Sequence, residues 1–317
     1  MSRFLKRLKG LSKDYSIIYA LVVMMIVFSI ASPYFLTKAN MINILFQSAT
    51  IGIASLGMAV CLISGNFDLS MGQNICLSSI VAAKLMKSGS VPIIIAVLAG
   101  IALAVFVGLC NGLLITYCRI PAFMATLGMM NICKGMARIV SNAVPISNLP
   151  DGIRQLGTGY LGPIPNCVIV LLALYIIMAY LTKNSKFFRY IYQIGGNENA
   201  AYYSGINVYK YRILTYMLCG FFTSISAILL YTKLDSATLT NGGSYEFDAV
   251  IACVIGGISL TGGKGKIFNA LFGSLFLITF FNGMTMLNVD SFWQDVIKGI
   301  VLLMAIGIDV VRGRKKK

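Results

Sequence analysis

The chain has 317 residues, of which 58% are hydrophobic and 11% are charged, and its formal net charge is +16. Soluble domains carry about 25% charged residues, so this composition excludes an ordinary soluble globular protein. The excess of positive charge does not indicate nucleic-acid binding. The cations gather at the two termini and in loops between apolar stretches, as the positive-inside rule describes for membrane proteins.

Long runs without charge, such as Ser16–Thr37, Ala39–Phe67 and Ser88–Cys118, have the length of membrane-spanning helices, which need about 20 apolar residues. Backbone groups in lipid must be satisfied within their own segment, and these runs lack the alternation of β-barrel strands, so we expect helices. The predicted helices span residues 15–33, 41–63, 71–86, 91–117, 121–140, 164–181, 212–233, 247–262, 267–287 and 291–311. The predicted fold class is an all-α polytopic membrane helical bundle of about ten transmembrane helices, with residues 1–317 as a single transmembrane domain.

Positive charge at both ends of the chain sets the predicted orientation. Cations near the N-terminus (Arg3, Lys6, Arg7, Lys9, Lys13) and the C-terminus (Arg312, Arg314, Lys315, Lys316, Lys317) place both termini in the cytoplasm, which requires an even number of spans. The loops on the same side then carry Arg119, Lys183, Lys186, Arg189, Lys210, Arg212, Lys264 and Lys266. We therefore predict a multi-pass protein of the cell membrane, surrounded by lipid.

Two interruptions break the apolar pattern, at Ser64–Gly72 and at Gly256–Gly263. In each interruption, glycine ends an apolar run, and the apolar pattern resumes at a small polar residue. Ser70 or Asp68 can cap the helix that follows the first interruption. Two interpretations remain open: broken helices of an internal repeat beside a transport pathway, as in many transporters, or two tight cytoplasmic turns.

Polar side chains within the predicted helices are candidates for contacts with a polar solute. They are Asp68, Asn111, Thr126, Asn131 and Asn282. The alternative for each is a structural role, such as a hydrogen bond between helices worth about 0.6 kcal/mol. Three cations, Lys134, Arg138 and Lys298, also fall within helices. We interpret them as snorkelling toward the outer interface, with Lys298 able to pair with Asp295 three positions earlier.

Catalytic signatures are absent from the sequence. There is no histidine, no cysteine pair with CxxC spacing and no phosphate-binding loop, because the glycine-rich Gly262–Lys266 lacks its spacing. The eight cysteines fall in or beside apolar stretches and are interpreted as small buried hydrophobes. We therefore expect no metal, no cofactor, no catalytic residue and no hydrolysis of ATP by this chain.

The basic loop 182–211 contains a short predicted helix, Glu198–Ser204. Asn197 suits the N-cap, Glu198 suits the positive helix end, and Gly205 suits the position after the C-cap. A helix of two turns is marginal alone, and the loop offers no fold of its own to bury it. We interpret it as an element that docks on a partner; the alternative is an ordinary surface turn.

Five segments in order resemble one family, the membrane permease subunits of ribose-type carbohydrate ABC importers. The segments are LISGNFDLSMG at 62–72, IPAFMATLG at 120–128, IGGNENAA at 194–201 with SGINV at 204–208, VIGGISLTGGKG at 254–265, and FWQ at 292–294 with KG at 298–299. The resemblance covers about Met41 to Val311. This chain differs from the family pattern at Asn66-Phe67, where the family usually has Gly-Ile.

The resemblance implies a sugar importer subunit that works by alternating access. It implies a second permease subunit, most simply in a homodimer, a cytoplasmic ATPase subunit, and an extracellular or periplasmic solute-binding protein; the solute would be ribose or a similar monosaccharide. The coupling contacts with the ATPase would then involve Gly195, Gly196, Asn197, Glu198, Ala200, Ala201, Gly205 and Ile206. The alternative is an ion-coupled secondary transporter of a polar solute, which predicts paired carboxylates within the membrane.

Overall fold

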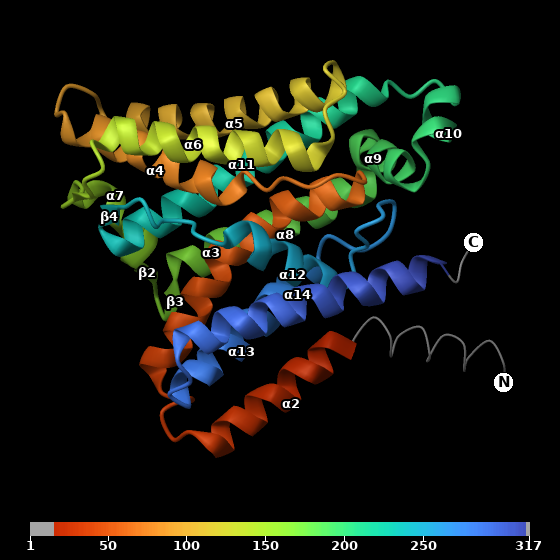
Figure 1. Cartoon of the computed structure of the whole chain (residues 1–317). Helices are drawn as coiled ribbons and strands as arrows, with labels where there is room; N and C mark the ends of the chain where they lie inside the picture. The colour runs from red at the N-terminus through yellow and green to blue at the C-terminus, as the bar shows by residue number, and fades with distance from the viewer. Residues whose placement is uncertain (1–15, 315–317) are drawn as a thin grey trace.

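The computed structural model describes residues 16–314, and helices form almost all of its regular structure (Figure 1). The helices are α2 Ser16–Ala31, α3 Lys38–Ile63, α4 Met71–Lys87, α5 Ile93–Thr116, α6 Ala122–Ser141, α7 Asp151–Thr158, α8 Asn166–Asn184, α9 Lys186–Gly196, α10 Glu198–Tyr203, α11 Val208–Leu234, α12 Tyr245–Ile255, α13 Asn269–Met286 and α14 Ser291–Arg314. Each predicted helix has a counterpart. The prediction for the terminal cations falls largely on residues 1–15 and 315–317, outside the described residues.

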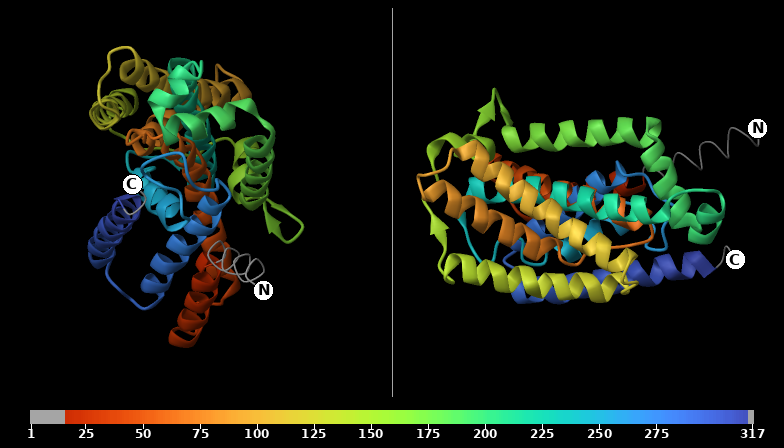
Figure 2. Two further views of the ribbon diagram at one scale, coloured as in Figure 1. Left: turned by 90° about the vertical axis from the view of Figure 1, so that its right-hand side faces the viewer. Right: turned by 90° about the horizontal axis from the view of Figure 1, so that it is seen from above.

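Helix α3 forms the centre of the bundle, since 89% of its most apolar 18-residue window is buried. It packs against α8, α11, α12 and α13, while α11 also packs along α5. The contact between α5 and α11 is close because glycines face backbone: a Cβ on Gly108 would lie 2.3 Å from the Tyr216 carbonyl oxygen. Small residues allow this approach between membrane helices. Viewed along the bundle, α2 and α14 lie at its periphery (Figure 2).

Five helices, α3, α5, α8, α11 and α13, are long and apolar enough to cross a membrane. This confirms the polytopic helical class, whereas the total number of spans stays a prediction. The prediction for residues 247–262 is wrong in length, because α12 ends at Ile255 and the chain turns at Gly257, whose φ is +87°. At 1.5 Å per residue the 11 residues of α12 cover about 16 Å, short of the ~30 Å hydrocarbon core.

Helices α4 and α12 both begin inside the bundle and meet at their N-terminal ends. An extended segment, residues 64–70, leads from the end of α3 to α4, and residues 238–244 lead into α12 (Figure 1). A Cβ on Gly72 would lie 2.5 Å from the Gly242 carbonyl oxygen and 2.1 Å from Glu246 Oε2. The first interruption therefore precedes α4, a helix of 17 residues that begins inside the bundle. The segment that meets the start of α4 is the one before α12, whereas Gly256–Gly263 forms a turn after α12.

The two ends of the bundle differ in construction. At one end lie α9 and α10, and we call it the α10 end; at the other, residues 142–166 form a cap that contains α7, and we call it the α7 end (Figure 1). In this cap β1 (Ile146–Ser147) pairs antiparallel with β4 (Ser236–Ala237), and β2 (Tyr160–Leu161) pairs with β3 (Ile164–Pro165).

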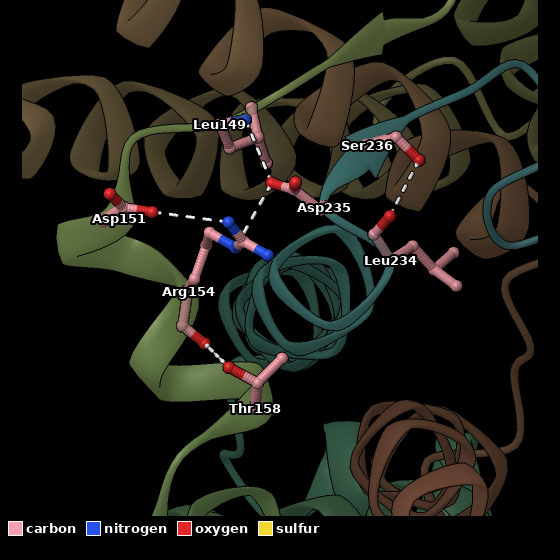
Figure 3. A network of polar contacts seen from close by, with 7 residues as sticks. All are labelled: Leu149, Asp151, Arg154, Thr158, Leu234, Asp235 and Ser236. Atoms are coloured by element: carbon pink, nitrogen blue, oxygen red, sulfur yellow. Dashed lines mark hydrogen bonds and ion pairs between the residues drawn. The ribbon is translucent and has the colours of Figure 1, made fainter.

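A cluster of polar contacts fixes the cap to the end of α11 (Figure 3). Arg154 pairs with Asp151 at 3.3 Å and with Asp235 at 3.5 Å. Asp235 Oδ1 also accepts the backbone N–H of Leu149 at 3.0 Å. The Asp235 carboxylate therefore joins Arg154 and the Leu149 backbone to the end of α11, beside the buried side chains of Leu149 and Ile153.

Candidate functional site

Helix α10 forms as its capping residues predict. The Asn197 side chain accepts the N–H of Ala200 at 3.0 Å, and Gly205 follows the C-cap Ser204 with a φ of +82°. Only glycine adopts this left-handed backbone without strain. The helix ends at Tyr203, one residue before the predicted end.

The expectation that α10 has no fold of its own to pack against is wrong. Ala201 and Ile206 are buried, 4% and 9% exposed, and pack with Ile194 and Val208. Ile194 belongs to α9, a helix that we had predicted as loop. A helical pattern of apolar residues was present there, at Phe187, Phe188, Ile191 and Ile194.

Residues other than Ala201 and Ile206 form the outer surface of α10. Asn199 and Ala200 are exposed, as are two tyrosines that sequence reasoning missed: Tyr202 is 59% exposed and Tyr203 86%. Ala201 and Ile206 thus stabilise α10 from beneath, whereas the tyrosines present a large aromatic surface. Aromatic side chains of this kind are enriched at protein interfaces.

An ion pair attaches α10 to the bundle. Glu198 binds Arg212 Nη2 of α11, and the two side chains are 53% and 12% exposed. Positive charge at the first turn of a helix would be unfavourable, so the carboxylate of Glu198 both complements the helix N-terminus and neutralises Arg212. Glu198 is therefore engaged within the chain.

The end of α9 contacts both interruptions of the apolar pattern. Gly263 donates its N–H to the Ile63 carbonyl oxygen at 2.8 Å. A Cβ on Gly195 would lie 1.9 Å from that same oxygen and 2.7 Å from the Gly263 nitrogen, and one on Gly262 would lie 2.8 Å from Gly65 Cα. We call this set, Gly65, Gly195, Gly262 and Gly263 with Ile63, the glycine junction. It leaves no room for a side chain at Gly195.

A tyrosine reinforces the glycine junction from α9. The Tyr192 hydroxyl donates to the Gly265 carbonyl oxygen at 2.6 Å, which ties α9 to the turn after α12. Burial raises the pKa of Tyr192, because the charged phenolate would lose its hydration. The hydroxyl therefore stays protonated and able to donate at neutral pH.

Asp68 and Asn111 are the two predicted pathway residues that the structure brings together. Asp68 Oδ1 accepts the Ser70 N–H at 2.9 Å, the Ser70 hydroxyl at 2.6 Å and the Asn111 amide at 3.2 Å. All three residues are fully or almost fully buried. Ser70 is the N-cap of α4 but its side chain makes no capping bond, so the predicted cap is replaced by a turn that Asp68 closes.

The other three pathway candidates lie apart from this group and from one another. The Thr126 hydroxyl donates to the Ala122 carbonyl oxygen within α6, and the exposed Asn131 donates to Leu127 in the same way. Asn282 exchanges amide hydrogen bonds of 2.9 and 2.8 Å with Asn40, across α13 and α3. Only the Asn282–Asn40 pair is a hydrogen bond between helices, as the structural alternative expects, whereas the bonds of Thr126 and Asn131 stay within α6.

Sequence reasoning missed two buried carboxylates at the start of α12, Glu246 and Asp248, which are 5% and 6% exposed. Asp248 Oδ1 lies 2.9 Å from Lys298 Nζ, so the expected pairing of Lys298 with Asp295 is wrong. Asp248 and Lys298 border a cavity of about 430 Å³ between the helix ends, which Phe46, Tyr245 and Phe281 also line. The cavity combines aromatic rings with amides and balanced charges.

Among residues 16–314, no cluster of three or more His, Cys, Asp or Glu side chains could hold a metal ion. Six of the eight cysteines are buried as interpreted, whereas Cys110 is half-buried and Cys118 is exposed. Lys134 and Arg138 are exposed on α6. Snorkelling remains the prediction for these two cations.

Comparison with known proteins identifies the family of the chain. A family model described as branched-chain amino acid transport system / permease component matches residues 40–306. The chain belongs to this permease family. The permease is 38% identical to the ribose import permease protein RbsC of Bacillus subtilis (strain 168), over 91% of this chain and 90% of that protein. It is 36% identical to RbsC of Escherichia coli (strain K12), over 92% and 91%.

A third relative carries a different sugar in its name. The permease is 31% identical to the galactose/methyl galactoside import permease protein MglC of Haemophilus influenzae (strain ATCC 51907 / DSM 11121 / KW20 / Rd), over 97% of each chain. No solved structure matches the chain. The resemblance to ribose-type permeases is thus confirmed. The permease is a multi-pass membrane transport subunit, and the alternative of an ion-coupled carrier is not favoured.

Proposed function

We propose that this permease carries ribose or a similar monosaccharide into the cell as one of two identical membrane subunits of an ATP-binding-cassette importer. A cytoplasmic ATPase supplies energy, and an extracellular or periplasmic binding protein delivers the sugar. The names of the relatives, ribose and galactose import permeases, support the substrate class. The chain spans the membrane ten times with both termini inside. In support, the start of α2 and the end of α14 both lie toward the α10 end (Figure 1).

The observation that carries the proposal is the continuous contact from α10 to α4 and α12. The exposed face of α10 receives the ATPase, and α10 packs on α9 through Ala201 and Ile194. The end of α9 meets the glycine junction, from which residues 64–70 lead to the start of α4 and the turn 256–268 leads back to the end of α12. A displacement of α10 therefore moves the segments that adjoin the start of α4 and the end of α12. This is the coupling step of alternating access.

The loop 182–211 acts as the coupling element in this scheme. Tyr202, Tyr203, Asn199 and Ala200 contact the ATPase directly, while Asn197, Ala201, Gly205 and Ile206 maintain the shape of α10. Gly195 and Gly196 join it to the bundle.

The sugar passes the polar groups beside the starts of α4 and α12. Asp68 and Asn111 are the leading candidates, because they lie where residues 64–70 enter α4. Thr126, Asn131 and Asn282 remain predicted contacts of the sugar. Cysteine labelling tests these three residues together with Asn111: sugar-dependent protection should appear at one or more of the positions 111, 126, 131 and 282. Protection at none of them would contradict this pathway.

A tyrosine pair tests the coupling proposal directly. We expect Tyr203→Ala to lower sugar uptake and sugar-dependent ATPase stimulation by about thirtyfold, since truncation of an interface hot spot costs about 2 kcal/mol and 1.4 kcal/mol is tenfold. The control is Tyr160→Ala, which removes a tyrosine that is 51% exposed at the α7 end. Membrane insertion, measured by protein yield and unfolding temperature, should be unchanged in both. Equal uptake by the two variants would refute the docking role.

Gly205→Val complements this test from within the helix. It forces a β-branched residue into a left-handed backbone, costs at least about 1–2 kcal/mol, and should abolish uptake while the protein still inserts. Uptake by the wild type should also require ATP and survive collapse of the proton gradient at constant ATP. An uncoupler that stops uptake would instead support an ion-coupled carrier.

A further inference from the structure

A short hairpin at the α7 end exposes apolar side chains where a hairpin in water would expose polar ones. In it β2 and β3 pair antiparallel, with Leu161 opposite Ile164, and Gly162 turns the chain between them with a φ of +63°. Tyr160 is 51% exposed, Leu161 70% and Ile164 47%, and residues 159–166 carry no charge. Large apolar side chains that gather at one exposed place mark a contact with a protein or with a membrane.

The hairpin points sideways from the bundle. In both views of Figure 2 it leaves the start of α8 and extends away from the other helices, across the direction in which they run. Figure 1 shows it at the level of the end of α2 and the start of α14, whereas α7 lies farther out. Helix α8 has 19 residues, or about 28 Å, which is close to the ~30 Å hydrocarbon core. The residues just before α8 therefore lie at the boundary between acyl chains and headgroups.

The surfaces that adjoin the hairpin are those of a protein in contact with lipid. Only 28% of the most apolar window of α8 is buried, and its exposed side chains include Ile176 and Ile177. At the level of the hairpin, Tyr34 after α2 and Trp293 at the start of α14 are exposed. Tyrosine and tryptophan are enriched at the boundary between membrane and water. Tyr160 extends this group of aromatic side chains to the start of α8.

The base of the hairpin is fixed to α7. Asn166 donates its backbone N–H to the Gly159 carbonyl oxygen at 3.0 Å and its side-chain amide to the Gln155 carbonyl oxygen at 2.8 Å. A Cβ on Gly159 would lie 2.4 Å from that same Gln155 oxygen, so the two segments approach as closely as backbones can. A contact of the hairpin with the membrane therefore also positions α7.

We propose that the β2–β3 hairpin is an interfacial anchor, with Tyr160, Leu161 and Ile164 inserted at the boundary between headgroups and acyl chains. The Tyr160 hydroxyl stays among the headgroups, and the two aliphatic side chains enter the acyl layer. Headgroups and water at this depth still satisfy the free backbone groups of a two-stranded hairpin, which the hydrocarbon core could not. A hairpin that extends along the membrane surface meets lipid, whereas a soluble protein reaches the α7 end from beyond α7. The anchor holds the cap at a fixed height over the membrane.

Fluorescence of a single tryptophan in the full-length permease tests the anchor. The chain has one tryptophan, so Trp293→Phe provides a background without any, into which Leu161→Trp is introduced. The protein is placed, one copy per disc, in nanodiscs of phosphatidylcholine with or without bromine on the acyl chains. Bromine next to the headgroup should remove most of the emission from position 161. Bromine at the far ends of the acyl chains should remove less, because the hairpin lies at the boundary and not in the core.

The matched control is Asp151→Trp in the same background, at an α7 position whose side chain is 97% exposed. Its emission should be the same in both lipids and should be quenched by acrylamide in the water. Equal emission from position 161 in brominated and unbrominated lipid would overturn the anchor. An emission from position 161 that changes only when a soluble binding protein is added would also overturn it, in favour of a protein contact. Neither the ATPase nor sugar is needed, so the result is independent of the proposed transport function.

Hydrogen exchange measures the effect of the anchor on the cap. The triple variant Tyr160→Ser, Leu161→Ser, Ile164→Ser should still insert, because insertion depends on the long helices. In phosphatidylcholine nanodiscs its α7 amides should exchange several-fold faster than those of the wild type. The amides of α4, inside the bundle, serve as the internal control and should exchange at the wild-type rate. Equal exchange of α7 in the two proteins would refute the effect on the cap and leave the lipid contact intact.

Discussion

The two ends of the bundle are held together by different kinds of contact. At the α10 end, backbone meets backbone across the glycine junction, and a Cβ on Gly195 would lie 1.9 Å from a carbonyl oxygen. At the α7 end, the cap is held by the buried side chains of Leu149 and Ile153, by two-residue strands, by a close backbone approach at Gly157 and by the ion pair of Arg154 with Asp235. The glycine junction consists of backbone contacts, whereas the attachment of the cap adds side-chain packing and a partly exposed ion pair.

This difference suits a membrane protein that transmits a movement from one end. Contacts between backbones convey a displacement without loss, because no side chain between them can change its rotamer. Exposed ion pairs contribute about 0–1 kcal/mol, so the ion pair of Arg154 adds little to the attachment of the cap. Three substitutions test this difference between the two ends, and the first should have the largest effect.

Gly195→Ala should be the most damaging of the three substitutions. The new methyl group overlaps the Ile63 carbonyl oxygen and the Gly263 nitrogen, both backbone atoms that cannot rotate away. Overpacking typically costs about 1–3 kcal/mol, and a contact this short belongs at or above the upper limit. We expect a marked fall in unfolding temperature in detergent and loss of sugar uptake.

Gly196→Ala is the matched control, because no atom lies within 4 Å of a Cβ built at Gly196. This variant should fold and transport normally. Equal stability of the two variants would show that the backbone of the glycine junction can move to admit a methyl group. The difference in rigidity between the two ends would then disappear.

Much of the fold could be predicted from the apolar pattern. The residues 41–63 and 71–86 correspond to α3 and α4 almost to the residue, because lipid-facing and buried helices both need long apolar runs. Helix α12 was overestimated because the apolar run continues through Gly256–Gly257 into Ile258. Composition alone does not distinguish a helix from a buried turn there. Helix α9 was missed because basic residues conceal its amphipathic pattern.

The site was predictable only where the information is local. The cap and end of α10 depend on Asn197 and Gly205, which are neighbours of the helix. The pairing of Lys298 with Asp248 joins two helices 50 positions apart, so the nearer Asp295 was the natural but wrong expectation. Likewise, nothing in the sequence indicates that Asn282 forms a hydrogen bond with Asn40, or that Asn111 forms one with Asp68.

Asp68 should respond to substitution less strongly than Gly195, and in a way that depends on the new side chain. The hydrogen bonds from the Ser70 N–H, the Ser70 hydroxyl and the Asn111 amide all end on Asp68 Oδ1, and asparagine retains that oxygen. Asp68→Asn should therefore keep much of the uptake. Asp68→Leu leaves the Ser70 N–H buried without an acceptor, at about 1–3 kcal/mol, while Asn111 keeps only its bond to the Ser70 hydroxyl, so this variant should lose stability and uptake. If both variants were equally inactive, the charge itself would be required.

Arg154→Gln at the α7 end should have the smallest effect of the three. Its ion-pair partner Asp151 is 97% exposed, and Asp235 still accepts the Leu149 N–H without it. The expected loss is about 0–1 kcal/mol, which for a protein of this size moves the unfolding temperature by no more than about 2–4 °C. Sugar uptake measured with saturating binding protein should stay near the wild-type rate. A loss as large as that of Gly195→Ala would mean that the cap is as rigid as the glycine junction, because only a contact without alternatives could make an exposed arginine so important.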